Sequence, residues 1–360
     1  VLGGSDSYTT GIRQDTYYSG PSWNRYFNPD LTWEVGEKIN LGLDLQLFND
    51  FNLTFDIFRE KRRDIFMTRE NSIPEIVGTG ETKITSNNGE MENKGLDLAI
   101  DYNKQITKDF FLSFKSTLTF ARNKVLKMDE PPYFEYPGLS DVGHPLGTYW
   151  GYVADGLFPD QETIDNSPRQ DLGYTPQPGD IKYVNQPNAK GEYDNVINSN
   201  DRVAIGHPYD PELVYGFGPS MKWKNWDFSF FFQGVARTSF MMYGMHPFGT
   251  TSIKNMLQFV ADDHWSVDNP NPNAAYPRLT KDSNGNNDQY STYWLRNAAF
   301  LKLKNAEIGY TYKGMRFYLS GVNLLTFSPF KHWDPEMGGG NGLYYPTQRV
   351  FNIGFQMTIQ

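Results

Sequence analysis

The sequence predicts an all-β protein, an antiparallel transmembrane β-barrel with long extracellular loops. Apolar and polar residues alternate strictly along several segments, and tight turns alternate with long connections. No run of about 18 apolar residues exists that could form a membrane helix. Hydrophobic residues make up 38% of the chain and aromatic residues 16%, yet the mean hydropathy is −0.60. The apolar residues are therefore abundant but distributed by alternation.

Residues 39–57 show the repeating unit. The odd-numbered residues from 39 to 47 are all Ile or Leu, whereas the even-numbered ones are Asn, Gly, Asp and Gln. After a break at Asn49 and Asp50 the alternation resumes with Leu53, Phe55 and Ile57. This pattern is typical of a β-hairpin with a tight turn. We expect the odd-numbered residues 39–47 to face lipid and their even-numbered neighbours to face the barrel lumen.

The same alternation predicts nine strands in all. A bulge is expected near Lys304 and Asn305, where the alternation changes parity. Residues 1–32 show no periodicity and are expected to form a loop. Beyond the first hairpin, the predicted strands cover residues 96–102, 112–120, 215–223, 228–232, 301–312, 317–321 and 351–359.

The connections between these strands are of two kinds. Tight turns are expected near residues 49, 108, 225 and 314, and long loops after residues 66, 127, 236 and 328. Outer-membrane barrels place all their short turns at one end and all their long loops at the other. The loops 127–210 and 236–297 are therefore expected to be extracellular and to contact both ligand and partner. The alternative is a soluble antiparallel sandwich acting as a β-rich glycan-binding module.

The net charge and the absence of cysteine argue against nucleic-acid binding, disulfides and thiolate metal sites. The formal net charge is −9, which disfavours a nucleic-acid partner because such a partner needs a basic surface. There is no cysteine, and so neither a disulfide nor a thiolate metal site. Because the sequence opens at Val1 without a signal peptide, we expect an internal or C-terminal piece of a longer precursor.

Six segments in one order resemble the C-terminal part of a SusC/RagA-type TonB-dependent outer-membrane transporter of the Bacteroidetes. Together they extend over nearly all 360 residues. The segments are NPDLTWE (28–34), GTYWGYVADGLF (147–158), PGDIKYVN (178–185), NDRVAIGHPYDPELVYGFG (200–218), FLKLKNAEIGYTY (300–312) and GVNLLTFSPFKHWDPE (321–336).

This resemblance implies that residues 1–360 are the C-terminal portion of a 22-stranded barrel and supply about its last nine strands. The plug and the TonB box would belong to an N-terminal region outside this sequence. The implied function is TonB-dependent import of an oligosaccharide or peptide across the outer membrane of a Gram-negative bacterium. The implied partners are a SusD-like surface lipoprotein, TonB–ExbB–ExbD, and the lipid and lipopolysaccharide around the barrel.

Aromatic residues in or beside the long loops are the candidate substrate-binding residues, because exposed rings can stack on sugars or cover a peptide. A methionine patch at Met241, Met242 and Met245 is expected to be an adaptable contact surface. The aromatic candidates are Tyr149, Trp150, Tyr152, Trp265, Tyr276, Trp294, Trp333, Tyr344 and Tyr345.

Metal and catalytic sites receive little support from the sequence. Asp194, Asn198 and Asp201 are a weak calcium candidate, because an insertion separates them from the earlier ligands of a calcium loop. No other metal or cofactor is expected. Neither two paired carboxylates nor a Ser/His/Asp arrangement is singled out, so no catalytic residue is predicted and the protein is not expected to be an enzyme.

The last strand leads to an expectation about the C-terminus. Phe351, Ile353, Phe355, Met357 and Ile359 share one face, so the next residue on that face would be number 361. Barrels of this kind usually end in an aromatic residue. We therefore expect an aromatic residue to follow Gln360 in the encoded protein.

Overall fold

The computed structural model describes residues 2–23, 26–69, 71, 73, 76, 84–244, 257–281 and 283–357. Its main feature is a nine-stranded antiparallel sheet in the order β19-β18-β17-β14-β13-β6-β5-β4-β3. Strands that are neighbours in this order are hydrogen-bonded to each other. The predicted nine strands are confirmed. They are β3 (Val35–Leu47), β4 (Phe51–Thr68), β5 (Thr85–Thr107), β6 (Phe110–Lys127), β13 (Leu213–Trp223), β14 (Trp226–Ala236), β17 (Phe300–Tyr312), β18 (Met315–Phe327) and β19 (Val350–Met357).

The predicted alternation continues from strand to strand across the whole sheet, because residues paired on neighbouring strands lie on the same face. Leu41 pairs with Ile57, Ile57 with Leu96, and Leu96 with Phe120, which pairs in turn with Leu213. We call this side of the sheet the apolar face. On β3 its side chains are exposed, 67% for Leu41 and 49% for Leu43. A soluble sandwich would bury one face of its sheet under a second sheet, whereas here the nine-stranded sheet forms a single curved layer.

The opposite side, the polar face, is held by hydrogen bonds and ion pairs between neighbouring strands. Thr54 Oγ1 donates to Asp44 Oδ1 over 2.8 Å, and Thr119 Oγ1 donates to Asp97 Oδ1 over 2.6 Å. Near the tight turns Arg316 forms ion pairs with Asp227 and Glu307. Polar groups of adjacent strands thus satisfy one another on this face.

The tight turns and the bulge lie where the sequence predicts them. Lys313 and Gly314 both have positive φ, 46° and 81°, as the two-residue turn between β17 and β18 requires. Lys224, in the turn from β13 to β14, has φ 52°. The register of β17 with β18 shifts between Leu303 and Asn305, which confirms the bulge.

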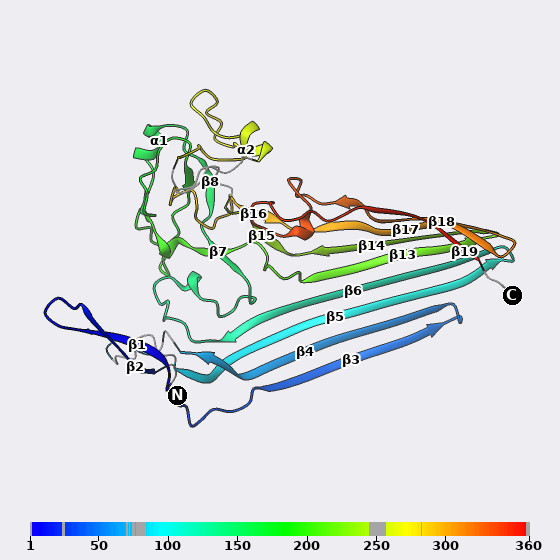
Figure 1. Cartoon of the computed structure of the whole chain (residues 1–360), viewed down its shortest axis with the longest axis horizontal. Helices are drawn as coiled ribbons and strands as arrows, with labels where there is room; N and C mark the ends of the chain where they lie inside the picture. The colour runs from blue at the N-terminus through cyan, green and yellow to red at the C-terminus, as the bar shows by residue number, and fades with distance from the viewer. Residues whose placement is uncertain are drawn as a thin grey trace.

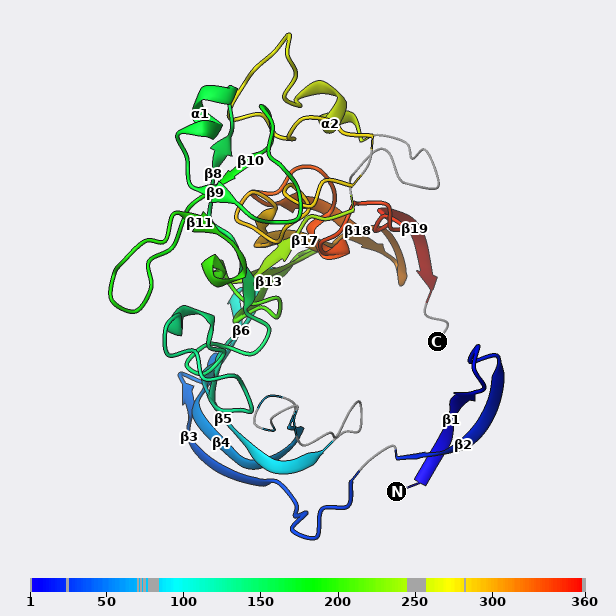
Figure 2. The ribbon, with the colours of Figure 1, turned by 90° about the vertical axis from the view of Figure 1, so that its left-hand side faces the viewer.

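Figure 1 shows that all the tight turns gather at one end of the sheet and all the long connections at the other. Viewed from the loop end in Figure 2, the sheet is an open arc. Within the described ranges, no helix has both the length and the apolar character needed to cross a membrane.

The prediction that residues 1–32 form a loop is wrong. β1 (Leu2–Thr10) and β2 (Thr16–Trp23) form a separate hairpin, in which Tyr8 pairs with Tyr18 and their rings stack at 5.4 Å. The hairpin lies apart from the nine-stranded sheet in both views (Figure 2). Its strands are rich in Ser, Thr, Gly and Tyr rather than in aliphatic residues, so hydrophobic alternation does not reveal them.

The long connections contain short elements rather than irregular loop alone. The first long connection holds β7 (Tyr149–Gly151), β8 (Ala154–Leu157), α1 (Gln161–Asp165), β9 (Arg169–Gln170), β10 (Ile181–Tyr183), β11 (Val196–Ile197) and β12 (Val203–Ile205). The second holds β15 (Ser239–Met241), α2 (Gln258–Asp262) and β16 (Leu295–Asn297).

Candidate functional site

The long connections fold together into one hydrophobic core, which we call the loop core. Its buried members run from Tyr152 to Phe330 and come from the connections rather than from the apolar face of the sheet. β7 pairs with β12, β8 with β10, and β15 with β16, so segments distant in sequence become neighbours. The loop core gives the long connections a fixed shape at one end of the sheet.

A buried polar network centred on Asp180 joins the first long connection to the second. Asp180 is fully buried, and its Oδ1 accepts hydrogen bonds from Arg278 Nε over 2.7 Å and from Asn284 Nδ2 and Asn287 Nδ2 over 2.9 Å each. Asp180 Oδ2 accepts from the backbone N–H of Gln177. Nearly all of the acceptor capacity of this carboxylate is therefore used within the loop core.

A second buried charge joins the connection between β18 and β19 to the sheet. Lys302 on β17 pairs with Gln233 on β14, which places it on the polar face. Its ammonium is fully buried and lies 2.6 Å from Asp334 Oδ2 and 2.6 Å from Glu336 Oε2. Although burial opposes ionisation, hydrogen bonds from Lys302 and Thr347 hold the pKa of Asp334 below its usual value. Residues 328–349 are thereby fixed over the polar face.

Five tyrosines from five different segments lie near one another beside these residues. The side chains of Tyr243 and Tyr344 are joined by a hydrogen bond. The hydroxyls of Tyr149 and Tyr243 each interact electrostatically with those of Tyr209 and Tyr290. We call Tyr149, Tyr209, Tyr243, Tyr290 and Tyr344 the tyrosine cluster. Four of its rings are about half exposed, whereas Tyr149 is more buried. The cluster thus offers ring faces and hydroxyls to a ligand.

Two members of the cluster, Tyr149 and Tyr243, have raised pKa values. Burial raises the pKa of Tyr149 to about 12, with a further contribution from Tyr209. The neighbouring hydroxyl of Tyr344 raises the pKa of Tyr243 above its usual value. At neutral pH the phenols of Tyr149 and Tyr243 stay protonated and can both donate and accept hydrogen bonds.

The glycine run at 338–340 allows the cluster to form. The N–H of Gly340 donates to the carbonyl oxygen of Met241 over 2.8 Å, and the N–H of Tyr243 donates to the carbonyl oxygen of Gly340 over 3.0 Å. A Cβ at Gly339 would lie 2.3 Å from the carbonyl oxygen of Met241, so only glycine fits there. This approach brings the segment of Tyr344 against the segment of Tyr243.

A pocket of about 180 Å³ opens beside the cluster, between Tyr243, Tyr290, Tyr276 and Trp294. Its polar lining is Ser283, Asn287, Asp288 and Gln289. None of its lining residues that the structure describes is basic, and one is a carboxylate. Aromatic rings next to amide and carboxylate groups suit a ligand that presents both an apolar surface and hydroxyl or amide groups.

Comparison with known proteins identifies the family. Residues 5–324 match the model of the family described as "TonB dependent receptor-like, beta-barrel". The chain belongs to this family of TonB-dependent receptors. The predicted resemblance to SusC/RagA-type transporters is confirmed by the relatives and solved structures described next.

Two curated relatives illustrate the match. A TonB-dependent receptor of Formosa agariphila is 26% identical over 378 residues, which cover 95% of this chain and 36% of the relative. The TonB-dependent receptor SusC of Bacteroides thetaiotaomicron is 27% identical over 369 residues, covering 95% of this chain and 34% of SusC. The chain thus spans about a third of the length of these relatives.

Two solved structures share the fold. The structure of the RagAB peptide transporter matches 98% of this chain and 38% of its own, with 21% identity and a TM-score of 0.69. The RagAB peptide importer in its "open-open" state matches 100% of this chain and 38% of its own, with 20% identity and a TM-score of 0.71.

Four of the nine aromatic candidates of this TonB-dependent receptor lie in the loop core. Tyr152, Trp265, Tyr276 and Trp294 are 3% to 7% exposed. Tyr276 and Trp294 meet edge to face at 5.4 Å and also line the 180 Å³ pocket. Packing inside the core accounts for most of the surface of these four rings, and substrate contact by them stays a prediction.

The other five candidates keep exposed surface. Tyr149 and Tyr344 belong to the tyrosine cluster. Trp150 donates from Nε1 to Asp141 Oδ1 over 2.6 Å, and Trp333 donates from Nε1 to the carbonyl oxygen of Gly338 over 2.8 Å. Tyr345 is 79% exposed. Their contact with substrate likewise stays a prediction.

Sequence reasoning missed Tyr209, Tyr243 and Tyr290. Tyr209 lies in residues 200–218, one of the six segments that carry the family resemblance, and Tyr243 directly follows Met242. Loops have no periodicity that could distinguish an exposed ring of a cluster from a ring packed in a core. The expected methionine surface is wrong for Met241 and Met242, which are 3% and 1% exposed within the loop core. Met245 lies outside the described residues, as do Ile359 and Gln360 at the C-terminus.

The weak calcium candidate uses its oxygens within the protein. Asn198 and Asp201 form a capping box: Asn198 Oδ1 accepts from the N–H of Asn200, and Asp201 Oδ2 accepts from the N–H of Asn198. Asp194 Oδ1 accepts from the N–H of Val196. The described residues contain no group of three or more His, Cys, Asp or Glu that could hold a metal ion. Calcium binding here stays a prediction.

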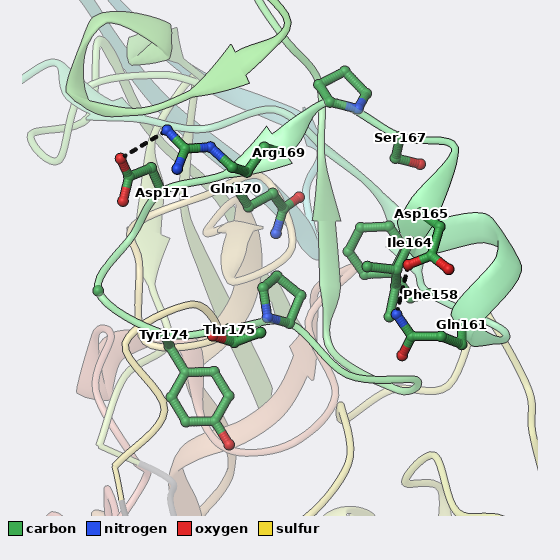
Figure 3. Close-up of a pocket in the computed structure, with 13 residues that line it drawn as sticks. Phe158, Gln161, Ile164, Asp165, Ser167, Arg169, Gln170, Asp171, Tyr174 and Thr175 are labelled. Carbon is green, nitrogen blue, oxygen red and sulfur yellow. Dashed lines mark hydrogen bonds and ion pairs between the residues drawn. The ribbon is translucent and has the colours of Figure 1, made fainter.

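A larger pocket of about 790 Å³ lies in the first long connection, around α1, β9 and residues 173–176 (Figure 3). Its rim charges pair with close neighbours: Arg169 with Asp171 over 3.3 Å, and Gln161 with Asp165 over 2.8 Å. Figure 1 places α1 far from the tight turns. The pocket shares no lining residue with the tyrosine cluster, so it is a concave surface separate from the cluster.

Proposed function

We propose that this chain forms part of the barrel wall of an outer-membrane transporter that imports a nutrient, an oligosaccharide or a peptide, with energy from TonB. The proposal is carried by one observation: a continuous apolar face runs in register across nine strands, while the polar face supports the tyrosine cluster and the loop core at one end. The curated relative SusC and the RagAB structures support a SusD-like lipoprotein as partner.

In this proposal the apolar face contacts lipid, the polar face lines the lumen, and the loops lie outside the cell. The tyrosine cluster contacts the nutrient above the polar face, where residues 328–349 are fixed by Lys302. The pocket around α1, at the loop end of the sheet, provides surface for the lipoprotein. TonB and its ExbB–ExbD partners act on a region outside these residues.

The test replaces one ring of the cluster in the full-length transporter. Tyr290→Ala is expected to lower uptake about tenfold, because ring stacking and one hydroxyl contact together contribute on the order of 1 to 2 kcal/mol. Uptake would be measured with panels of fluorescent oligosaccharides and peptides in a deletion strain that carries the variant.

Tyr193→Ala is the matched control, since Tyr193 is also exposed, at 61%, but lies outside the cluster. Surface amounts of both variants would be equalised with an impermeant label. Equal uptake by both variants would contradict a role of the cluster in substrate contact. A protein that extracts fully in plain buffer would contradict the transporter itself and favour a soluble glycan-binding module.

A further inference from the structure

A row of cations crosses the apolar face just beyond its last apolar residues. Ile57, Leu96 and Phe120 are register partners on β4, β5 and β6. Two residues further toward the loops, the register partners are Arg59, Lys94 and Arg122. Like charges directly opposite one another destabilise a sheet unless anions lie among them. Three adjacent cations at this boundary therefore need a counter-charge.

The protein supplies only part of that counter-charge. Glu92 is shared between Arg59, at 2.5 Å, and Lys94, at 2.6 Å. Glu212 is likewise shared between Arg122, at 3.1 Å, and Arg237, at 2.7 Å. In the described part of the chain, Lys124 has no ion pair. Each carboxylate thus serves two cations, which leaves an excess of positive charge.

A groove of about 570 Å³ lies on this boundary. Its apolar part is formed by Ile57, Leu96 and Phe120, and its charged part by Glu92 with three cations, Lys94, Arg122 and Lys124. Lys94 and Arg122 are more than half exposed. Gly143 and Pro145, from the start of the first long connection, complete the lining. The groove is therefore apolar on its membrane side and cationic on its loop side.

We propose that this groove binds a phosphorylated lipid of the outer leaflet, with the phosphate against Lys94, Arg122 and Lys124 and an acyl chain over Ile57, Leu96 and Phe120. The inference rests on the proposed placement in the outer membrane, where the loop end of the apolar face lies at the level of the headgroups. Basic groups at that level attract anionic lipid headgroups. Free phosphate would contact only the charged part of the groove, because it has no apolar group to pack against Ile57, Leu96 and Phe120.

The experiment uses the full-length transporter purified from outer membranes and placed in nanodiscs. Binding of phosphorylated lipid A, and of the same lipid after enzymatic removal of its phosphates, would be measured by native mass spectrometry. The wild type is expected to prefer the phosphorylated lipid. Lys94→Gln together with Lys124→Gln is expected to weaken its binding by about 10- to 30-fold, given the contribution of each basic side chain near an anionic lipid.

Lys115→Gln together with Lys222→Gln is the matched control. These two lysines lie on the polar face of β6 and β13, so the same number of charges is removed from the same sheet. The control is expected to bind the phosphorylated lipid as the wild type does, and excess inorganic phosphate is not expected to compete.

Equal binding of both lipids, an equal loss in both double variants, or full competition by inorganic phosphate would each overturn the inference while the proposed function stands. A chain absent from the outer-membrane fraction would overturn the proposed function and the inference together.

Discussion

Asp180→Ala is expected to destabilise the loop core by about 3 to 5 kcal/mol, the usual cost of removing one partner from a buried ion pair. The substitution leaves the Arg278 guanidinium without its carboxylate and leaves the buried amides of Asn284 and Asn287 without an acceptor. The two long connections should then separate locally while the sheet remains intact. In the full-length receptor, protease cleavage within the loops should be at least about 100-fold faster.

Asp155→Ala is the control for this variant. Asp155 also forms an ion pair, with Lys182 at 2.8 Å, but its side chain is 61% exposed. Its loss should change stability by no more than about 1 kcal/mol, as is usual for exposed pairs. If the two variants were cleaved at the same rate, Asp180 would not join the two connections.

Lys302→Ala is expected to release residues 328–349 from the wall, also at a cost of about 3 to 5 kcal/mol. The fully buried Lys302 lies 2.6 Å from both Asp334 and Glu336. Its removal leaves these two carboxylates close together, and of the two only Glu336 keeps an ion pair, with Lys304 at 2.6 Å. Hydrogen exchange of the backbone amides of 334–344 should rise strongly, since their protection depends on this attachment.

Lys38→Ala serves as the comparison, because Lys38, whose side chain is 69% exposed, pairs with Glu60 at 3.5 Å on the same sheet. Exchange in 334–344 should be unchanged in that variant. Unchanged exchange in Lys302→Ala as well would show that contacts other than this ion pair fix residues 328–349.

The sheet was predictable because its strands repeat one physical rule. Every strand must present apolar side chains on one face, so alternation reveals each strand, and a change of parity reveals the bulge at Lys304 and Asn305. The β1–β2 hairpin escaped prediction because its strands are mainly polar.

The candidate site was only partly predictable. Tyr149 and Tyr344 are among the predicted rings, yet the cluster they belong to depends on contacts between residues far apart in sequence. Asp180 meets Asn284, and Met241 meets Gly340, only after the connections have folded. No local pattern separates a ring that packs in the loop core, such as Trp265, from one that remains exposed, such as Tyr209.

Spin labels at Leu43 and Asp44 of the full-length receptor in a bilayer test the central claim most directly. These neighbours lie on opposite faces of β3, and Asp44 accepts a hydrogen bond from Thr54 on the polar face. The label at Leu43 should be relaxed by oxygen, which concentrates in lipid, and the label at Asp44 by a water-soluble nickel chelate. Equal accessibility of both labels, or the reverse order, would contradict a wall with lipid on its apolar face and water on its polar face.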